Sequence, residues 1–199
     1  MFSIRLAQSA DIDAAIAAMG DAFAPDPLMA WFFAPHPAGV RTAATTFFSI
    51  LLRARLALGA PALVLQQGTD VLGLAMGYAT TRPVWPAAFT AEWAALEAVT
   101  PGLAARFAAY DHVADAHQPA EPHYYLGAIG IHSALQGQGA GKALLNAYCD
   151  LSAADPLSRG VYLETGSDSS LRFYLRNGFE LRGEADLGGT HLWCLYRPT

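Results

Sequence analysis

The fold is decided by residues 124–145, which read YYLGAIGIHSALQGQGAGKALL. The stretch opens with a continuous apolar segment over 124–131, typical of a buried strand, and closes with the start of an apolar helix. Between the two stand Gly137, Gly139 and Gly141. Glycines at a helix entrance leave backbone N–H groups and the positive end of the helix dipole uncovered. We therefore expect this turn to bind a phosphate group.

Two nucleotide-binding motifs can be tested by their spacing. A P-loop requires G-x-x-x-x-G-K-[ST], but Gln136 stands where the first glycine belongs and Ala143 where the hydroxyl belongs. The dinucleotide fingerprint requires G-x-G-x-x-G, and here the third glycine comes one residue early. The P-loop is therefore disfavoured, and the dinucleotide fold stays as a weak alternative.

Regular elements are predicted on both sides of this stretch. Alternation or helical spacing of apolar residues predicts strands at 2–6, 62–66, 71–78, 161–164, 179–182 and 191–196, and helices at 12–23, 40–58, 140–151 and 169–176. Region 83–122 is predicted to be helical on both sides of Pro101-Gly102. Neither an internal repeat nor a Gly/Ser linker interrupts the order. We expect one mixed α/β domain over residues 1–199.

Composition and charge exclude several classes of protein. Hydrophobic residues make up 53% and charged residues 15%, which excludes a disordered chain. The net charge of −5, with no arginine cluster, argues against a nucleic-acid partner. The richest apolar stretch, 47–65, is broken by two arginines, a glycine and a proline, so no membrane span is expected.

The start of the chain and its cysteines bear on location. The first residues lack the apolar core of a secretory signal. Cys149 and Cys194 have no partner spacing for zinc or for a redox pair. We expect a reduced, cytoplasmic protein without a metal site, and the sequence leaves the oligomeric state open.

A third phosphate motif fits the spacing better than the first two. The pattern Gln136-x-x-Gly139-x-Gly141 after a strand resembles the pyrophosphate loop of the GNAT superfamily of N-acetyltransferases, written [RQ]-x-x-G-x-[GA]. Residues 163–179, LETGSDSSLRFYLRNGF, resemble that superfamily's strand, splayed turn and tyrosine helix. The resemblance spans most of the chain except 83–122, and its C-terminal part is similar to puromycin N-acetyltransferase-like members.

The resemblance implies a fold and a set of site residues. The fold is the GNAT fold, a twisted mixed sheet of about six to seven strands flanked by helices and splayed between strands Tyr124–Ile131 and Val161–Glu164. Tyr174 corresponds to the tyrosine that protonates the departing CoA thiolate. Lys142 is either a charge beside the pyrophosphate or a solvated side chain. The residues implied to bind acetyl-CoA are Ile129, Gly130 and Ile131 for the pantetheine arm, Gln136, Gly137, Gln138, Gly139, Ala140, Gly141 and Lys142 for the pyrophosphate, and Ser170, which stands where many members have asparagine.

The general base and the acceptor site stay open at this level. The central strand carries no carboxylate, so the base candidates are Glu121, His123, His132, Glu164, Asp111 and the C-terminal carboxylate of Thr199. Aromatic residues of the variable regions are candidates for the acceptor pocket or for the core: Trp31, Phe32, Phe33, Trp85, Phe89, Trp93, Tyr110, Tyr124 and Tyr125.

The expected function is transfer of an acetyl group from acetyl-CoA to a primary amine, most readily that of a small, partly apolar molecule. One alternative is acetylation of a protein N-terminus or lysine, favoured if the acceptor groove is open and acidic. The other is a non-catalytic CoA-binding regulatory module, which would not need Tyr174.

Overall fold

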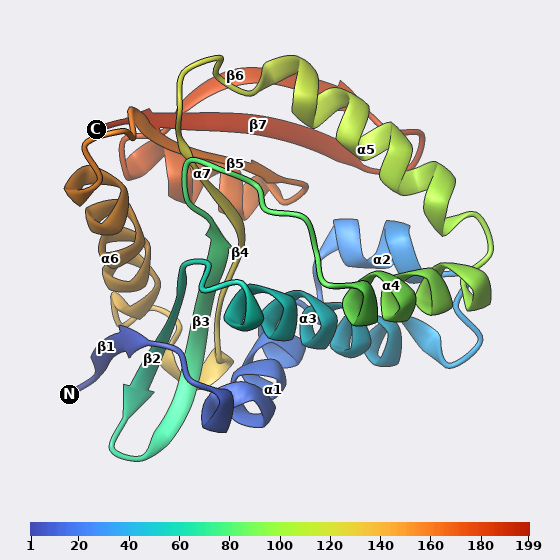
Figure 1. Ribbon diagram of the computed structural model, residues 1–199, viewed down its shortest axis with the longest axis horizontal. Coiled ribbons are helices and arrows are strands. Elements are labelled where there is room, and N and C mark those ends of the chain that lie inside the picture. The colour runs from blue at the N-terminus through green and yellow to red at the C-terminus, as the bar shows by residue number, and fades with distance from the viewer.

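The computed structural model describes residues 1–199 and is built on one seven-stranded sheet, in the order β1-β2-β3-β4-β5-β7-β6 (Figure 1). Only β4 and β5 pair in parallel, and every other neighbouring pair is antiparallel. The strands are β1 (Ser3–Leu6), β2 (Ala62–Gln67), β3 (Asp70–Tyr78), β4 (Tyr124–Ile131), β5 (Gly160–Thr165), β6 (Glu180–Asp186) and β7 (His191–Pro198).

Seven α-helices flank the sheet: α1 (Ile12–Ala22), α2 (Pro27–Phe33), α3 (Gly39–Ala57), α4 (Ala87–Val99), α5 (Leu103–His117), α6 (Ala140–Ala154) and α7 (Asp168–Arg176). None of them combines the length and the apolarity that a membrane crossing demands. The region predicted as helical over 83–122 consists of α4 and α5, separated at Pro101-Gly102, where Gly102 adopts a φ of 73°.

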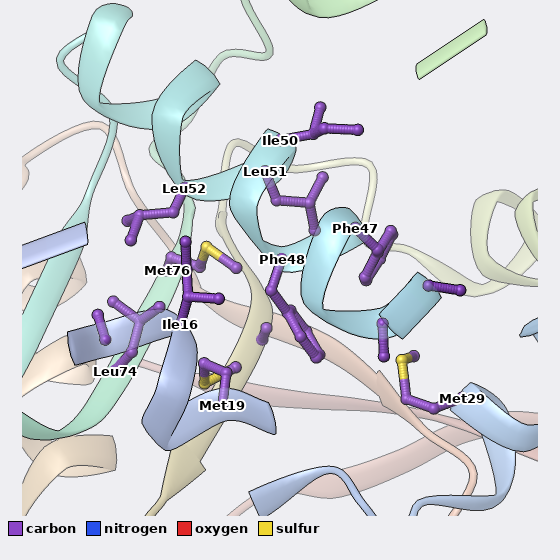
Figure 2. Close-up of a cluster of buried hydrophobic side chains, with 14 of the residues drawn as sticks. Ile16, Met19, Met29, Phe47, Phe48, Ile50, Leu51, Leu52, Leu74 and Met76 are labelled. Atoms are coloured by element: carbon purple, nitrogen blue, oxygen red, sulfur yellow. The ribbon is translucent and has the colours of Figure 1, made fainter. Parts of the chain in front are cut away.

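The two faces of the sheet bury separate hydrophobic cores. On one face α1 and α3 pack against β2, β3 and β4 (Figure 1). Figure 2 shows this core, in which Met19 of α1 and Phe48 of α3 lie beside Leu74 and Met76 of β3. The opposite face is covered by α6, whose Leu144 and Tyr148 are fully buried. The apolar spacing that predicted these helices is thus the spacing of their buried faces.

Strand β4 is irregular at the centre of the sheet. Met76 of β3 pairs with Ala128 and Gly77 pairs with Leu126, so Gly127 has no partner and forms a β-bulge. A side chain at Gly130 would lie within 3 Å of Met19 and Ala22, so this glycine allows α1 to pack directly on the strand. The bulge and the close packing of α1 both shape the site described next.

Candidate functional site

The sheet opens between β4 and β5. These strands pair only at Tyr124 with Val161 and at Tyr125 with Tyr162, after which they separate. Ile129 and Ile131 pair with β3 on one side, and their other backbone edge has no strand partner. The splay predicted between these two strands is therefore confirmed, and it leaves a strand edge on which an extended ligand can form backbone hydrogen bonds.

The glycine turn follows directly after this open edge. Gly137 and Gly139 adopt φ angles of 75° and 79°, a left-handed conformation that favours glycine, and no atom lies within 4 Å of where their Cβ atoms would be. Residues 136–139 are exposed. The backbone N–H groups of residues 139–142, at the start of α6, donate to no acceptor in the protein. This arrangement presents several free donors and the positive end of a fifteen-residue helix to one anion.

The remaining sequence-predicted residues lie around the same opening. Lys142 is exposed and makes no ion pair. Ser170 and Tyr174 are both on α7 and line a cavity beside the splayed strands. The Tyr174 ring is buried, and its hydroxyl makes no hydrogen bond with the protein. Burial and the nearby carboxylate of Asp26 raise the pKa of Tyr174 well above its usual value, so the hydroxyl keeps its proton.

The cavity has a volume of about 510 Å³, a size suited to a small molecule. Most of its wall is apolar, and its residues come from α2, α3, α4 and α5 on one side and from β4, the end of β5 and α7 on the other. Of the nine aromatic residues singled out in the sequence, five line it, namely Phe32, Trp85, Trp93, Tyr110 and Tyr125, and four do not, namely Trp31, Phe33, Phe89 and Tyr124. Stacking of Phe32 on Phe107, with ring centroids 4.1 Å apart, fixes one side of the wall.

Glu164 is the most perturbed acid of the cavity. It is the fifth residue of β5, and its Oε2 accepts a hydrogen bond of 2.8 Å from the Tyr110 hydroxyl. Burial raises the pKa of Glu164 to about 7, and hydrogen bonds from Tyr110 and Tyr125 offset only part of that increase. A carboxyl group with this pKa can exchange a proton with a substrate near neutral pH.

The other base candidates are separated by position. Asp111 also lines the cavity, whereas Glu121, His123, His132 and Thr199 do not. His132 instead accepts from the backbone N–H of Ala134. Of the six candidates, only Glu164 and Asp111 are therefore placed to act on a molecule in the cavity.

Two charged residues of the cavity were not among the sequence-predicted site residues. Asp26 caps α2 by accepting from the backbone N–H of Met29, and burial raises its pKa. Arg55 is 3% exposed and lies on the inner face of α3. The signal available for Arg55 was its spacing, since it follows the buried Leu51 by four residues and so lies on the same helix face.

Solved structures of similar fold are numerous, and several cover this chain completely. A structure described as histone acetyltransferase HPA2 and related acetyltransferase from Corynebacterium glutamicum superposes with a TM-score of 0.72, at 24% identity, over 100% of this chain and 97% of that chain. An agmatine N-acetyltransferase superposes with a TM-score of 0.70, at 16% identity, over all of both chains. At these identities the likeness establishes the fold.

The family is established by the sequence itself. The model of the acetyltransferase (GNAT) family matches residues 28–179, which include the opening between β4 and β5, the glycine turn and α7. The sequence motifs, the splayed sheet and this match agree, and the chain belongs to the GNAT family of acetyltransferases, enzymes that transfer an acyl group to an amine.

Proposed function

We propose that residues 1–199 form a single N-acetyltransferase domain that transfers acetyl from acetyl-CoA to the primary amine of a small, partly apolar molecule. The observation that carries the proposal is the combination of three features at the splay of β4 and β5: free backbone donors at the start of α6, an unpaired edge of β4, and a cavity lined by Glu164 and by β4 residues up to Ile129. The free cysteines Cys149 and Cys194 agree with the cytoplasmic location expected from the sequence.

The donor side is formed mainly by backbone atoms. The open edge at Ile129, Gly130 and Ile131 would hold the pantetheine arm, and the free N–H groups that follow Gln136 would hold the pyrophosphate. The free N–H groups are those of Gly137, Gly139, Ala140, Gly141 and Lys142, while the N–H of Gln138 donates to Leu135. Gln138 would contribute by its place in the turn, and Ser170 faces the cavity from α7. Acetyl-CoA supplies the activated thioester, and these residues orient it.

Two side chains would move protons. Glu164, with its pKa near 7, would accept a proton from the acceptor ammonium and so produce the nucleophilic amine. Tyr174, whose hydroxyl is protonated and free of other hydrogen bonds, would donate its proton to the sulfur that leaves. The two groups lie on β5 and α7, and both line the same cavity.

The acceptor class follows from the shape and charge of the acceptor side. Seventeen of the 26 residues that line the cavity are hydrophobic, which suits a small apolar group better than a flexible basic peptide, whose ordering has a cost. The net charge of −5 favours the approach of a cationic amine. The C-terminal similarity to puromycin N-acetyltransferase-like members points the same way.

The test is CoA release, monitored with a thiol reagent, against a panel of small aromatic amines and basic peptides. We expect higher kcat/KM for the small amines. A tenfold preference for peptides would replace the acceptor class with protein acetylation and leave the acetyltransferase function intact. If the protein binds CoA but no amine in the panel causes CoA release, the chain is a non-catalytic regulatory module.

A further inference from the structure

Arg55 is a buried cation without a counter-charge. Arg55 is 3% exposed, and no carboxylate forms an ion pair with it. Its guanidinium carbon lies 4.6 Å from the centre of the Tyr78 ring, and Nη1 donates 3.2 Å to the carbonyl of Leu51. Nε is buried and has no hydrogen-bond partner. Removing a guanidinium from water in this way is costly unless a ligand supplies the missing partner.

The free end of this guanidinium is at the wall of the acceptor cavity. Arg55 lines the cavity, and its Nη2 makes no hydrogen bond within the protein. A Cβ atom at Gly127 would be 3.0 Å from that nitrogen, so the glycine of the β4 bulge keeps the space beside it open. The groups near Arg55 are the rings of Tyr78, Tyr125 and Tyr148 and the cation of Arg82. An anionic oxygen is the group that this environment lacks.

We propose that Arg55 binds the carboxylate of the acceptor, and that the acceptor is an α-amino acid with an apolar side chain. This inference rests on the proposed acetyltransferase function and specifies its substrate. Glu164 supplies the opposite charge in the same cavity, so a zwitterion finds a partner at each end.

The Arg55 guanidinium lies beside Gly127 of β4, and this position limits the distance between the amine and the carboxylate of the acceptor. Gly127, beside the guanidinium, is two residues from Ile129, where the acetyl end of the donor would lie, so the two positions are separated along the chain by at most about 7 Å, the fully extended length. An amine that attacks near Ile129 while its carboxylate contacts Arg55 is therefore expected to carry the two groups close together, as an α-amino acid does. Phe32, Trp93 and Phe107 then form the wall that a large apolar side chain would contact.

The experiment compares matched acceptors on the full chain: L-phenylalanine, L-leucine and L-methionine, the amide of each, and 2-phenylethylamine. The wild-type ratio of kcat/KM for acid over amide is divided by the same ratio for Arg55→Met, which cancels the intrinsic reactivity of each amine. We expect this quotient to be about tenfold or more for at least one amino acid, as a charge-assisted hydrogen bond predicts. Arg53→Met is the matched control, because Arg53 lies on the same helix but pairs with Glu92, and its quotient should be one.

Several outcomes would overturn the inference. A quotient near one for every amino acid would do so, and an equal loss of kcat for acids, amides and 2-phenylethylamine would make Arg55 a catalytic or structural group instead. If Arg55→Met does not fold, Arg55→Lys and calorimetry of wild-type enzyme with CoA and each acid or amide replace it, and equal affinity for acid and amide refutes the inference. If no amine releases CoA, the proposed function fails, yet the same calorimetry still tests whether Arg55 holds a carboxylate.

Discussion

Replacement of Glu164 by glutamine removes the proposed base and retains its size. The amide oxygen can still accept the hydrogen bond from Tyr110, which is 2.8 Å long in the wild type. General base catalysis typically contributes about 10² to 10⁴ in rate, so kcat at pH 7 should fall within that range. The loss should be greater for an alkylamine of pKa about 10 than for an α-amine of pKa about 8, which is already partly neutral.

The pH dependence follows from the pKa of Glu164, near 7. Wild-type activity should rise as the pH increases through about 7, because the carboxylate form is the base, and Glu164→Gln should lack this rise. The free energy of unfolding of the wild type should instead fall as the pH rises over the same range. A carboxyl group whose pKa is raised by folding favours the native state only while it is protonated, so its ionisation between pH 4.5 and 7 destabilises the wild type relative to Glu164→Gln.

The magnitude is set by the interval from 4.5 to about 7. At about 1.36 kcal/mol per pKa unit, Glu164→Gln should gain up to about 3 kcal/mol of stability over the wild type above pH 7. The gain should vanish near pH 4, where Glu164 is mostly protonated in both the folded and the unfolded wild type. Urea unfolding at the two pH values measures it.

Asp111→Asn is the matched control, because Asp111 also lines the cavity but stays exposed to solvent. Its kcat should stay within a few-fold of the wild type. An unchanged kcat in Glu164→Gln, under conditions where chemistry limits the rate, would exclude Glu164 as the base. An equal stability difference at both pH values would show that its pKa is not raised by folding.

Three further changes test the donor site and the sheet. Gly139→Asp should abolish the stabilisation of the fold by CoA, which is about 2.7 kcal/mol at a CoA concentration of 100 times Kd. Gly139→Asn should retain it, because asparagine tolerates the same positive φ and adds no charge. Loss of the stabilisation in both variants would indicate backbone strain. Tyr174→Phe should lower kcat by about 10² or more with little change in CoA affinity, and an unchanged kcat would make Tyr174 a core residue only. Gly77→Ala should destabilise the fold strongly in urea unfolding, because the added Cβ would lie 1.7 Å from the carbonyl oxygen of Tyr125; wild-type stability would contradict the packing described for β3 and β4.

The elements and the backbone geometry of the proposed donor site were predictable from the sequence because their signals are local. The apolar run at 124–131 and the glycine spacing at 137–141 describe neighbouring residues, and the structure places them as a strand with an open edge and a turn with free N–H groups. Backbone donors need no side chain from elsewhere in the chain. The pattern therefore contains nearly all the geometry of that half of the site.

The acceptor side was only partly predictable because its contacts are long-range. Tyr110 and Glu164 are 54 residues apart in sequence, and no local pattern pairs them or indicates that burial raises the pKa of Glu164. Arg55 interrupts an apolar stretch, a sign that counted against a membrane span but gave no indication of a cavity. Whether the Arg55 guanidinium can contact a ligand depends on the absence of a side chain at Gly127, which lies on a different element, β4.

This difference in construction has a consequence for how acceptor specificity can vary. The proposed donor site depends on backbone atoms of β4 and of the start of α6, whereas the proposed acceptor cavity depends on side chains, many of them from α2 to α5. Substitutions in those helices can change size and charge in the cavity without touching the groups that would hold CoA. The splayed sheet joins the two proposed halves at Gly127 to Ile129, where donor geometry and acceptor geometry are coupled, and Ser170 and Tyr174 of α7 are shared in the same way.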